Sequence, residues 1–385
     1  MRTPSPNQLV FLVFFGLFFV TAPLVVLYTA GYRWQPSRGV LRTGTLFVSS
    51  VPDNATIFLN EEKMSDRTPA VIKTLLPGEY NVRLEREGHM AWEKTLPVHE
   101  NTTTFIDRVL LFAKSAPRLL IREPVARATW SQDGKYVAWA QTQEGWSEVW
   151  ISTLESPASR LVSRMASSAT PELAWDGDVL TITVGDNVRA VTVEGLEVVP
   201  PLPEPTPVEL VPATSYTDVF YNGSFLARLP NGTYTIADTR GSYITLIDRA
   251  HDRLFLLTSA DREAPLLLQE DAIFFDWVRR DALAFGTPYS ISMYEPSKHT
   301  TTLVTRISEP LHALMWHPDG GYIFYATDHE VRAIELDDRD GRRVTSLASL
   351  PIIETFSMDP RGRTLYLVGN DGMDQGVFVR EITER

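Results

Sequence analysis

The sequence predicts an all-β protein carried on a single N-terminal transmembrane helix: a small β-sandwich, then a six-bladed β-propeller, with seven blades as the alternative. Three observations predict this architecture. An uncharged apolar run lies near the start of the chain. Period-two strands separated by turn residues follow it. Beyond them, a tryptophan followed by a tight turn recurs about every 40–45 residues, which is typical of propeller blades.

Composition limits what the chain can be. Its 385 residues suffice for two or three globular units, and 44% hydrophobic with 22% charged residues is ordinary for folded domains. The net charge of −12 argues against a nucleic-acid partner, since phosphate binding depends on clustered Lys and Arg. The densest basic pairs, Arg279-Arg280 and Arg342-Arg343, are interpreted as turn residues. The chain has no cysteine, which excludes disulfides, thiolate metal sites and cysteine nucleophiles.

The apolar run extends from Leu9 to Tyr28 and contains no charged residue. Fifteen of its twenty residues are Leu, Val or Phe. At about 1.5 Å per residue, a helix of this length covers the roughly 30 Å hydrocarbon core of a bilayer. Tyr28, Tyr32 and Trp34 would form an aromatic belt at its end. We therefore expect a short tail over residues 1–8 and a transmembrane helix over residues 9–28.

A cleaved signal peptide is the alternative for this segment. Its apolar region usually spans 7–15 residues and ends at a small-x-small site. The run here is longer, and Tyr28-Thr29-Ala30 places a bulky ring where a small residue is needed. An uncleaved anchor is the preferred interpretation. The flanking charges do not settle its orientation, because Arg33, Arg38 and Arg42 follow the run whereas Arg2 precedes it.

A polar linker over residues 29–43 leads into a small β-domain over residues 44–112. Alternating strands are expected at Thr45–Val48, Ala55–Leu59 and Tyr80–Glu85, and the last strand falls within Thr102–Phe112. Turn residues such as Pro77-Gly78 separate them. No helical period of useful length is present, so the segment predicts a β-sandwich.

This segment resembles the PEGA domain, a small β-module of bacterial and archaeal envelope proteins. The matching residues occur in order along it: Gly44-Thr45-Leu46, Ser50-x-Pro52, Ala55–Asn60, Thr68-Pro69, Leu76–Tyr80, Val82-x-Leu84 and Glu87-Gly88-His89. His89 departs from the aromatic residue usual in the family, and we expect no loss of fold from it. The resemblance brings no catalytic residues. It implies an extracytoplasmic location, so the N-terminus is expected in the cytoplasm and the β-domains outside it.

The propeller is expected over residues 116–385, on the strength of internal repeats. Three clear copies of a tryptophan-and-turn motif, the third without its Trp, lie at Trp130–Trp139, Trp316–Tyr325 and Met358–Tyr366. Two weaker copies lie at Ala174–Leu180 and Asp276–Phe285. The turn glycine supplies a tight hairpin, and the preceding Trp is expected to pack between blades. The motif is similar to TolB-like propeller repeats. Val199–Pro212 interrupts the series and is interpreted as an extended Pro-rich loop, with a docking peptide as the alternative.

No linear catalytic or phosphate-binding motif is present, so no catalytic, cofactor-binding or metal-binding residue is assigned. The acidic segments Asp337–Gly341 and Asp371–Asp374 lack the spacing of a calcium loop and are interpreted as solvated turns. His312 and His317 are interpreted as structural. Trp146, Trp150 and Trp175 are interpreted as packing between blades, rather than as a platform on which sugars stack.

Two functions are consistent with these features. The first is a membrane-anchored, extracytoplasmic binding or scaffold protein without catalysis or cofactors, whose propeller holds a protein partner or a cell-envelope polymer. The second is a propeller-based enzyme, a hydrolase or lyase, with carboxylates gathered in the central channel. The first is preferred, because the anchor and the two β-modules need no chemistry. Three or more carboxylates converging in the channel would favour the second.

Overall fold

The computed structural model describes residues 6–383 apart from 30, 36–38, 132, 155–157, 168, 186, 200–206, 261–263 and 279–281, and only the backbone of 6–9, 12 and 35. The chain divides into two compact units, with the boundary between Lys114 and Ser115. Apart from one α-helix and one 3-10 turn, the described elements are strands, so the all-β prediction is confirmed. The Arg279-Arg280 pair lies outside the described residues.

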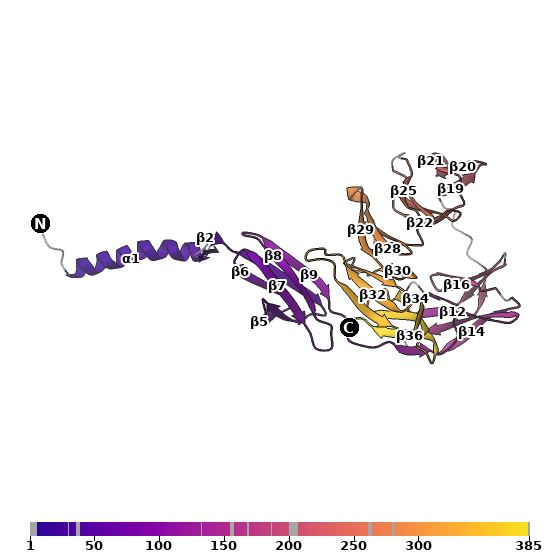
Figure 1. The fold of residues 1–385 in the computed structure, drawn as a ribbon, viewed down its shortest axis with the longest axis horizontal. Helices are drawn as coiled ribbons and strands as arrows, with labels where there is room; N and C mark the ends of the chain where they lie inside the picture. The colour runs from indigo at the N-terminus through magenta and orange to yellow at the C-terminus, as the bar shows by residue number, and fades with distance from the viewer. Residues whose placement is uncertain are drawn as a thin grey trace. The chain divides into compact units, whose positions relative to one another are not determined.

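Helix α1 (Pro6–Thr29) precedes a short hairpin of β1 (Tyr32–Gln35) and β2 (Gly39–Arg42), which lies within the predicted linker (Figure 1). The Arg33 guanidinium donates to the Tyr28 carbonyl at 2.8 Å, close to the end of the helix. A search of the described residues finds no helix with the length and apolar character needed to cross a membrane.

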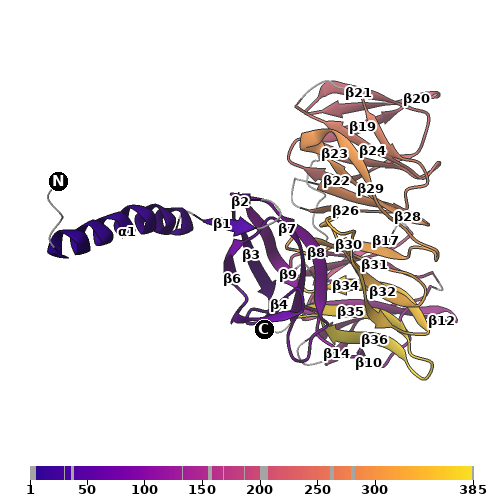
Figure 2. The ribbon, with the colours of Figure 1, turned by 60° about the vertical axis from the view of Figure 1, so that its left-hand side comes forward.

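The first unit contains two sheets packed face to face, as the sandwich prediction requires (Figure 2). One is ordered β6 (Ala70–Leu75), β3 (Gly44–Val51), β9 (Thr103–Leu110), and the other β5 (Glu62–Arg67), β4 (Thr56–Leu59), β7 (Gly78–Glu85), β8 (Trp92–Val98). The alternating apolar residues of both sheets meet in one buried core that includes Leu46, Ile57, Leu84 and Trp92. Each of these side chains is removed from water because its strand places it on the inner face.

The described part of the second unit forms seven antiparallel sheets in chain order. The first sheet contains β11 (Arg127–Trp130), β12 (Tyr136–Gln143), β13 (Trp146–Thr153) and β14 (Ser159–Met165), the second β15 (Glu172–Asp176), β16 (Val179–Val184), β17 (Asn187–Thr192) and β18 (Glu197–Val198), and the third β19 (Val208–Pro212), β20 (Tyr216–Tyr221) and β21 (Ser224–Pro230). The fourth sheet contains β22 (Tyr234–Arg240), β23 (Tyr243–Asp248), β24 (Arg253–Thr258) and β25 (Leu266–Gln269), and the fifth β26 (Phe274–Val278), β27 (Ala282–Thr287), β28 (Ser290–Glu295) and β29 (Thr300–Arg306). The sixth sheet contains β30 (Ala313–Trp316), β31 (Tyr322–Ala326), β32 (Glu330–Glu335) and β33 (Val344–Ser349), and the seventh β34 (Ile352–Met358), β35 (Thr364–Asn370) and β36 (Gln375–Glu381) with β10 (Arg118–Ile121). The 3-10 turn η1 (Pro296–Lys298) joins β28 to β29.

The prediction of six blades is wrong for the described residues, which give seven sheets, the alternative count. The additional sheet is the third, and its first strand β19 occupies Val208–Pro212, where a Pro-rich loop was predicted. The loop prediction for residues 200–206 lies outside the described residues. The third and fourth sheets escaped the repeat search because their first hairpins turn through Ala213–Ser215 and Gly241-Ser242, without the tryptophan-and-turn motif.

The seventh sheet combines the two ends of the second unit. Strand β10, from the start of the unit, pairs antiparallel with β36, from its end, through Arg118 opposite Val379 and Ile121 opposite Val377. Sharing one sheet between the two ends of this unit holds them together, and β10 covers the edge of β36. Because the paired residues are about 260 positions apart, no local pattern predicts this contact.

Tryptophans link neighbouring sheets, as the repeat predicted. The indole N–H of Trp175 donates to the Thr129 carbonyl at 3.4 Å, from the second sheet to the first. That of Trp277 donates to Thr245 Oγ1 at 3.0 Å, from the fifth sheet to the fourth. That of Trp316 donates to the Asp276 carbonyl at 2.8 Å, from the sixth sheet to the fifth. The predicted packing of these residues between blades is confirmed.

Two turn glycines of the repeats, Gly134 and Gly362, also lie against the preceding sheet. A Cβ atom at Gly134, in the first sheet, would overlap Pro360 in the turn of the seventh. A Cβ atom at Gly362, in the seventh sheet, would overlap the ring of His317 in the turn of the sixth. Both glycines have positive φ, +69° and +70°. Glycine is therefore needed in these two turns for backbone conformation and for the close approach of successive sheets.

Candidate functional site

A pocket of about 150 Å³ lies on the first sheet of the second unit and is lined by Gln143, Trp146, Glu148 and Arg164. Trp146 is 51% exposed, which is unusual for the largest apolar side chain. The pocket combines one aromatic face with an amide and an ion pair. Such a mixture of apolar surface and a few convergent polar groups is characteristic of ligand sites.

Strand register places the four side chains together. Gln143 is paired with Trp146 across the hairpin of β12 and β13, and Glu148 is paired with Arg164 across β13 and β14. Paired residues share a face of an antiparallel sheet, and so do Trp146 and Glu148, two residues apart. The hairpin turns at Gly145, whose φ of +83° suits glycine.

The charges of the pocket are matched internally. Arg164 Nε donates to Glu148 Oε1 at 2.7 Å, and Arg164 Nη2 donates to the same oxygen. Glu148 Oε2 accepts the indole N–H of Trp150 at 3.3 Å. The guanidinium also lies over the Trp146 ring, 6.0 Å from its centroid. Since one carboxylate and one guanidinium neutralise each other, the pocket carries no net charge.

The three tryptophans interpreted as packing residues have different environments. Trp175 stacks on Tyr136 with ring centroids 6.3 Å apart, and Trp150 stacks on the buried Trp139 at 6.4 Å. Both belong to the cores between sheets, so the packing interpretation is confirmed for them. It is wrong for Trp146. That ring lies at the end of its hairpin, and half of its surface faces solvent.

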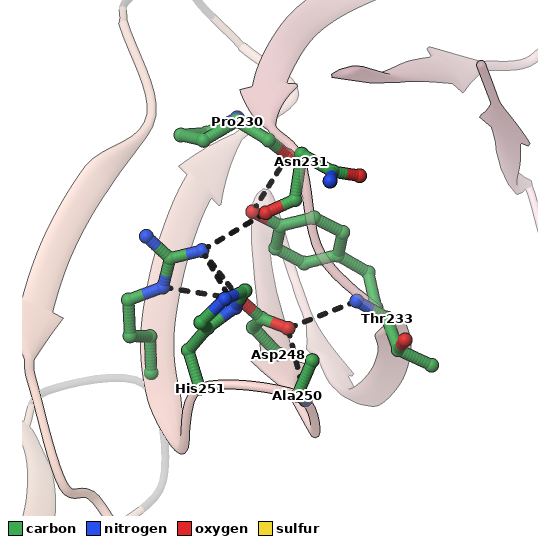
Figure 3. Close-up of polar contacts among 8 residues, drawn as sticks. Pro230, Asn231, Thr233, Asp248, Ala250 and His251 are labelled. Atoms are coloured by element: carbon green, nitrogen blue, oxygen red, sulfur yellow. Dashed lines mark hydrogen bonds and ion pairs between the residues drawn. The ribbon is translucent and has the colours of Figure 1, made fainter. Parts of the chain in front are cut away.

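A second polar cluster surrounds Asp248 at the end of β23 (Figure 3). The carboxylate is completely buried and accepts backbone N–H groups from Thr233 at 2.9 Å and Ala250 at 3.1 Å. Arg253 donates to it through Nε at 3.0 Å and Nη2 at 2.5 Å. His251 Nδ1 lies 2.8 Å from Oδ2, and this nitrogen donates because a carboxylate can only accept. The cluster joins the β21–β22 connection, at Thr233, to the β23–β24 turn, at Ala250 and His251.

The same contacts set the ionisation of Asp248. Burial on its own raises the pKa of a carboxyl, but hydrogen bonds from Arg253, His251 and the two backbone N–H groups outweigh it, and the pKa is lowered from 3.8 to about 2. A carboxyl whose pKa is lower in the folded chain stabilises the fold above its unfolded pKa, and the stabilisation is lost as pH falls toward the folded value.

We therefore expect Asp248 to contribute up to about 2 kcal/mol of stability at neutral pH, lost between about pH 4 and pH 2. The measurement is the free energy of unfolding of the second unit from pH 5 to pH 2, for the wild type and Asp248→Asn. The wild type should lose more stability over this range than the variant, which has no carboxyl to titrate at this position. Parallel curves would show that Asp248 does not carry this acid sensitivity.

Polar groups also gather on the first strands of the fourth, fifth and sixth sheets. Asp276 Oδ2 accepts the backbone N–H of Trp316 at 2.8 Å, and the indole N–H of Trp316 donates to the Asp276 carbonyl, also at 2.8 Å. Arg240 Nε lies 3.3 Å from Asp238 Oδ2. Burial raises the pKa of Asp276 to about 6, against the opposing effects of the Trp316 N–H and the Arg240 charge. Asp238 and Asp276 thus both interact electrostatically with the Arg240 guanidinium.

The histidines and acidic turns singled out in the sequence have separate partners. His312 Nε2 lies 2.5 Å from Asp328 Oδ1, whereas His317 contacts Asp319 and the Gly362 carbonyl. The Asp371 carboxylate accepts the N–H groups of Met373 and Asp374 within the β35–β36 turn, so this segment forms a hairpin turn as predicted. Within the described residues, no group of three or more His, Cys, Asp or Glu could hold a metal ion.

Comparison with known proteins identifies the first unit. The PEGA domain family matches residues 43–111, which confirms the resemblance predicted for residues 44–112. None of the curated proteins is similar to this chain in sequence.

Comparison with solved structures finds WD40 domains and a lyase among those similar to this chain. They include the C-terminal WD40 domain of Sif2 (12% identity, TM-score 0.42, 88% of this chain and 97% of that chain). Two others are the Neurospora crassa Pan2 WD40 domain (11%, 0.46, 68% and 91%) and an oligogalacturonate lyase from Vibrio parahaemolyticus (12%, 0.47, 69% and 91%). At these identities and scores the similarities carry no argument about function. The TolB-like character of the repeats stays a prediction.

Proposed function

We propose that this chain is a membrane-anchored, extracytoplasmic binding protein that works without catalysis, with its propeller holding a protein partner or a cell-envelope polymer. The observation that carries the proposal is the Trp146 pocket. An exposed aromatic face beside an amide and a neutralised ion pair provides contacts for a ligand. The seven sheets supply a rigid support for such a site, and the PEGA domain connects that support to the N-terminal segment.

The anchor is proposed from the sequence of Leu9–Tyr28, which has no charged residue, although the search of the described residues finds no helix that could cross a membrane. In helix α1, Phe14 and Phe18 are more than 60% exposed, and the other large apolar side chains described there are also exposed. A helix that is apolar on all sides and exposed favours a nonpolar environment. Tyr28 and Trp34, both largely exposed, would then lie at the level of the lipid headgroups.

Charges placed within the helix should release the chain from membranes. We expect the wild type to sediment with membranes and to resist extraction by high salt and alkali. The double variant Val13→Asp, Phe18→Lys should shift to the soluble fraction, since each mid-helix charge costs about 2.5–3.5 kcal/mol of insertion. Thr43→Lys, which adds a charge beyond the helix, is the control and should stay with the membrane. A wild type found in the soluble fraction would contradict the anchor.

Orientation needs a separate measurement. A reporter enzyme that is active only outside the cytoplasm, fused after Arg385, should be active, and the same reporter fused before residue 1 should be silent. The opposite pattern would place the propeller in the cytoplasm and would require a cytoplasmic partner instead.

The binding function is tested by affinity capture on the intact protein from solubilised membranes. We expect a reproducible protein or polymer to be retained by the wild type at stoichiometric levels. Repeated capture that returns neither would contradict the proposal.

A propeller-based hydrolase or lyase is the second candidate, and the partly buried Asp276, with its raised pKa, favours it. A carboxyl with a pKa of about 6 is suited to proton transfer near neutral pH. The test is the release of reducing ends or unsaturated products from polysaccharides by the purified chain. Release that is abolished by Asp276→Asn in a folded variant would overturn the non-catalytic proposal.

A further inference from the structure

The four residues of the Trp146 pocket leave several groups free to meet a ligand. Among the described residues, none forms a hydrogen bond with the Gln143 side-chain amide or with the Trp146 indole N–H. Arg164 donates to Glu148 through Nε and Nη2, and none of the described residues accepts a hydrogen bond from its Nη1. The pocket therefore offers an apolar ring face, three kinds of N–H donor (amide, indole and guanidinium) and one amide acceptor.

These groups suit a sugar ring. One face of a pyranose is made of C–H groups that pack on an indole, and its rim is made of hydroxyls that both donate and accept hydrogen bonds. The Gln143 amide can satisfy either kind of hydroxyl contact, and the Arg164 guanidinium adds a donor. The volume of about 150 Å³ lies below the roughly 300–1,000 Å³ of sites that enclose drug-sized ligands, so the pocket holds about one ring.

The charge of the pocket selects among sugars. An anionic ligand would need an unpaired cation, and Arg164 is already paired with Glu148 at 2.7 Å. Breaking that pair would leave Glu148, which is largely buried, without its cation, and this would oppose binding. The matched charges thus favour an uncharged sugar over a uronic acid.

A proline-rich peptide is the other ligand that packs on tryptophan, and the geometry is less suited to it. Grooves for such peptides present several exposed aromatic rings. Here the next ring along the face, Trp150, is stacked on Trp139 and packed in the core shared by the seventh and first sheets. A single exposed ring surrounded by three hydrogen-bonding side chains fits a polyhydroxylated ligand better.

We infer that the pocket formed by Gln143, Trp146, Glu148 and Arg164 binds one neutral sugar unit of a polysaccharide. This inference rests on the proposed binding function and assigns it to an envelope polymer rather than to a protein. A single ring in so open a site binds weakly, with a dissociation constant of about a millimolar. Useful retention then depends on repeated units along the polymer.

The test is affinity electrophoresis of the full chain in detergent through gels that contain dextran, mannan or a β-glucan, with polygalacturonate as the acidic probe. At least one neutral polymer should retard the wild type. Trp146→Ala should weaken retardation at least tenfold, and Gln143→Ala severalfold. The matched control is Tyr289→Ala, because Tyr289 is 55% exposed at the equivalent hairpin of the fifth sheet. This variant should behave as the wild type does.

Several results would overturn the inference. Equal retardation of Trp146→Ala and the wild type would show that this pocket does not bind the sugar. Trp146-dependent retardation by polygalacturonate alone would show that the ligand is acidic rather than neutral. Trp146-dependent binding of a polyproline peptide, without binding of any polysaccharide, would show that the ligand is a peptide. If no polymer retards the wild type but affinity capture still returns a stoichiometric partner, the sugar assignment fails and the binding function stands. If both experiments are negative, both proposals fail.

Discussion

Replacing Asp248 with alanine is expected to lower the free energy of unfolding of the second unit by about 3–5 kcal/mol. The change leaves the Arg253 guanidinium, which is mostly buried, without its carboxylate, and it removes the acceptor for the N–H groups of Thr233 and Ala250. Buried donors without partners cost far more than the net gain from a single hydrogen bond. The measurement is calorimetric unfolding of the intact chain, in which the transition of the second unit is followed separately from that of the first.

Asp218→Ala is the matched control for this variant. Asp218 also forms a two-point contact with an arginine, since Arg228 donates to both of its oxygens at 2.7 and 3.0 Å. That pair is open to solvent at Arg228, which is 55% exposed, and exposed ion pairs contribute little to stability. We therefore expect Asp218→Ala to change the free energy of unfolding only slightly. Equal losses for the two variants would show that the burial of Asp248 is not the cause of its importance.

Gly362→Ala is expected to destabilise the second unit by about 2–5 kcal/mol, the second of the two largest effects on folding stability. Two costs add. A side chain at a φ of +70° is strained by about 1–2 kcal/mol, and the new methyl group would overlap the ring of His317 in the neighbouring sheet. Overpacking of this kind typically costs about 1–3 kcal/mol. His317 cannot easily move, because its ring is buried and contacts both Asp319 and the Gly362 carbonyl.

A second glycine of the same sheet separates the two costs. Gly372 also has positive φ, +96°, but a Cβ atom there would lie 3.7 Å from Pro351, an ordinary contact distance. Gly372→Ala should therefore show the backbone cost alone, about 1–2 kcal/mol. Calorimetry on both variants tests the comparison. If Gly372→Ala is as damaging as Gly362→Ala, the close approach of the sixth and seventh sheets contributes nothing measurable.

The repeated motif acquires its physical meaning from these contacts. In the sequence, each copy indicates a hairpin with a tryptophan before it. In the structure, the tryptophan donates its indole N–H to the preceding sheet, as Trp277 and Trp316 do, and two of the turn glycines, Gly134 and Gly362, lie against the preceding turn. The sheets that carry the motif are thereby fixed to the ones before them. Substitutions in one turn are expected to act on the junction between two sheets.

The sequence by itself determined the order of the modules and the type of their elements. Period-two alternation indicated strands, the ordered PEGA residues located the first sandwich, and the Trp130, Trp316 and Met358 repeats indicated propeller sheets. These features are local. Strand period and turn chemistry depend on residues within a few positions of one another, and they can be recognised without knowing what packs on them.

Only the tertiary structure decided the rest, because it depends on residues far apart in the chain. The pairing of β10 with β36 and the third sheet beginning at Val208 follow from neighbours that no local pattern specifies. Trp146 and Trp150 are four residues apart on the same strand, yet the core between two sheets covers one and leaves the other exposed. The exposure of a side chain depends on what surrounds it in the fold. For this reason the sequence pattern indicates packing for Trp146, whereas the structure places it in a candidate binding pocket.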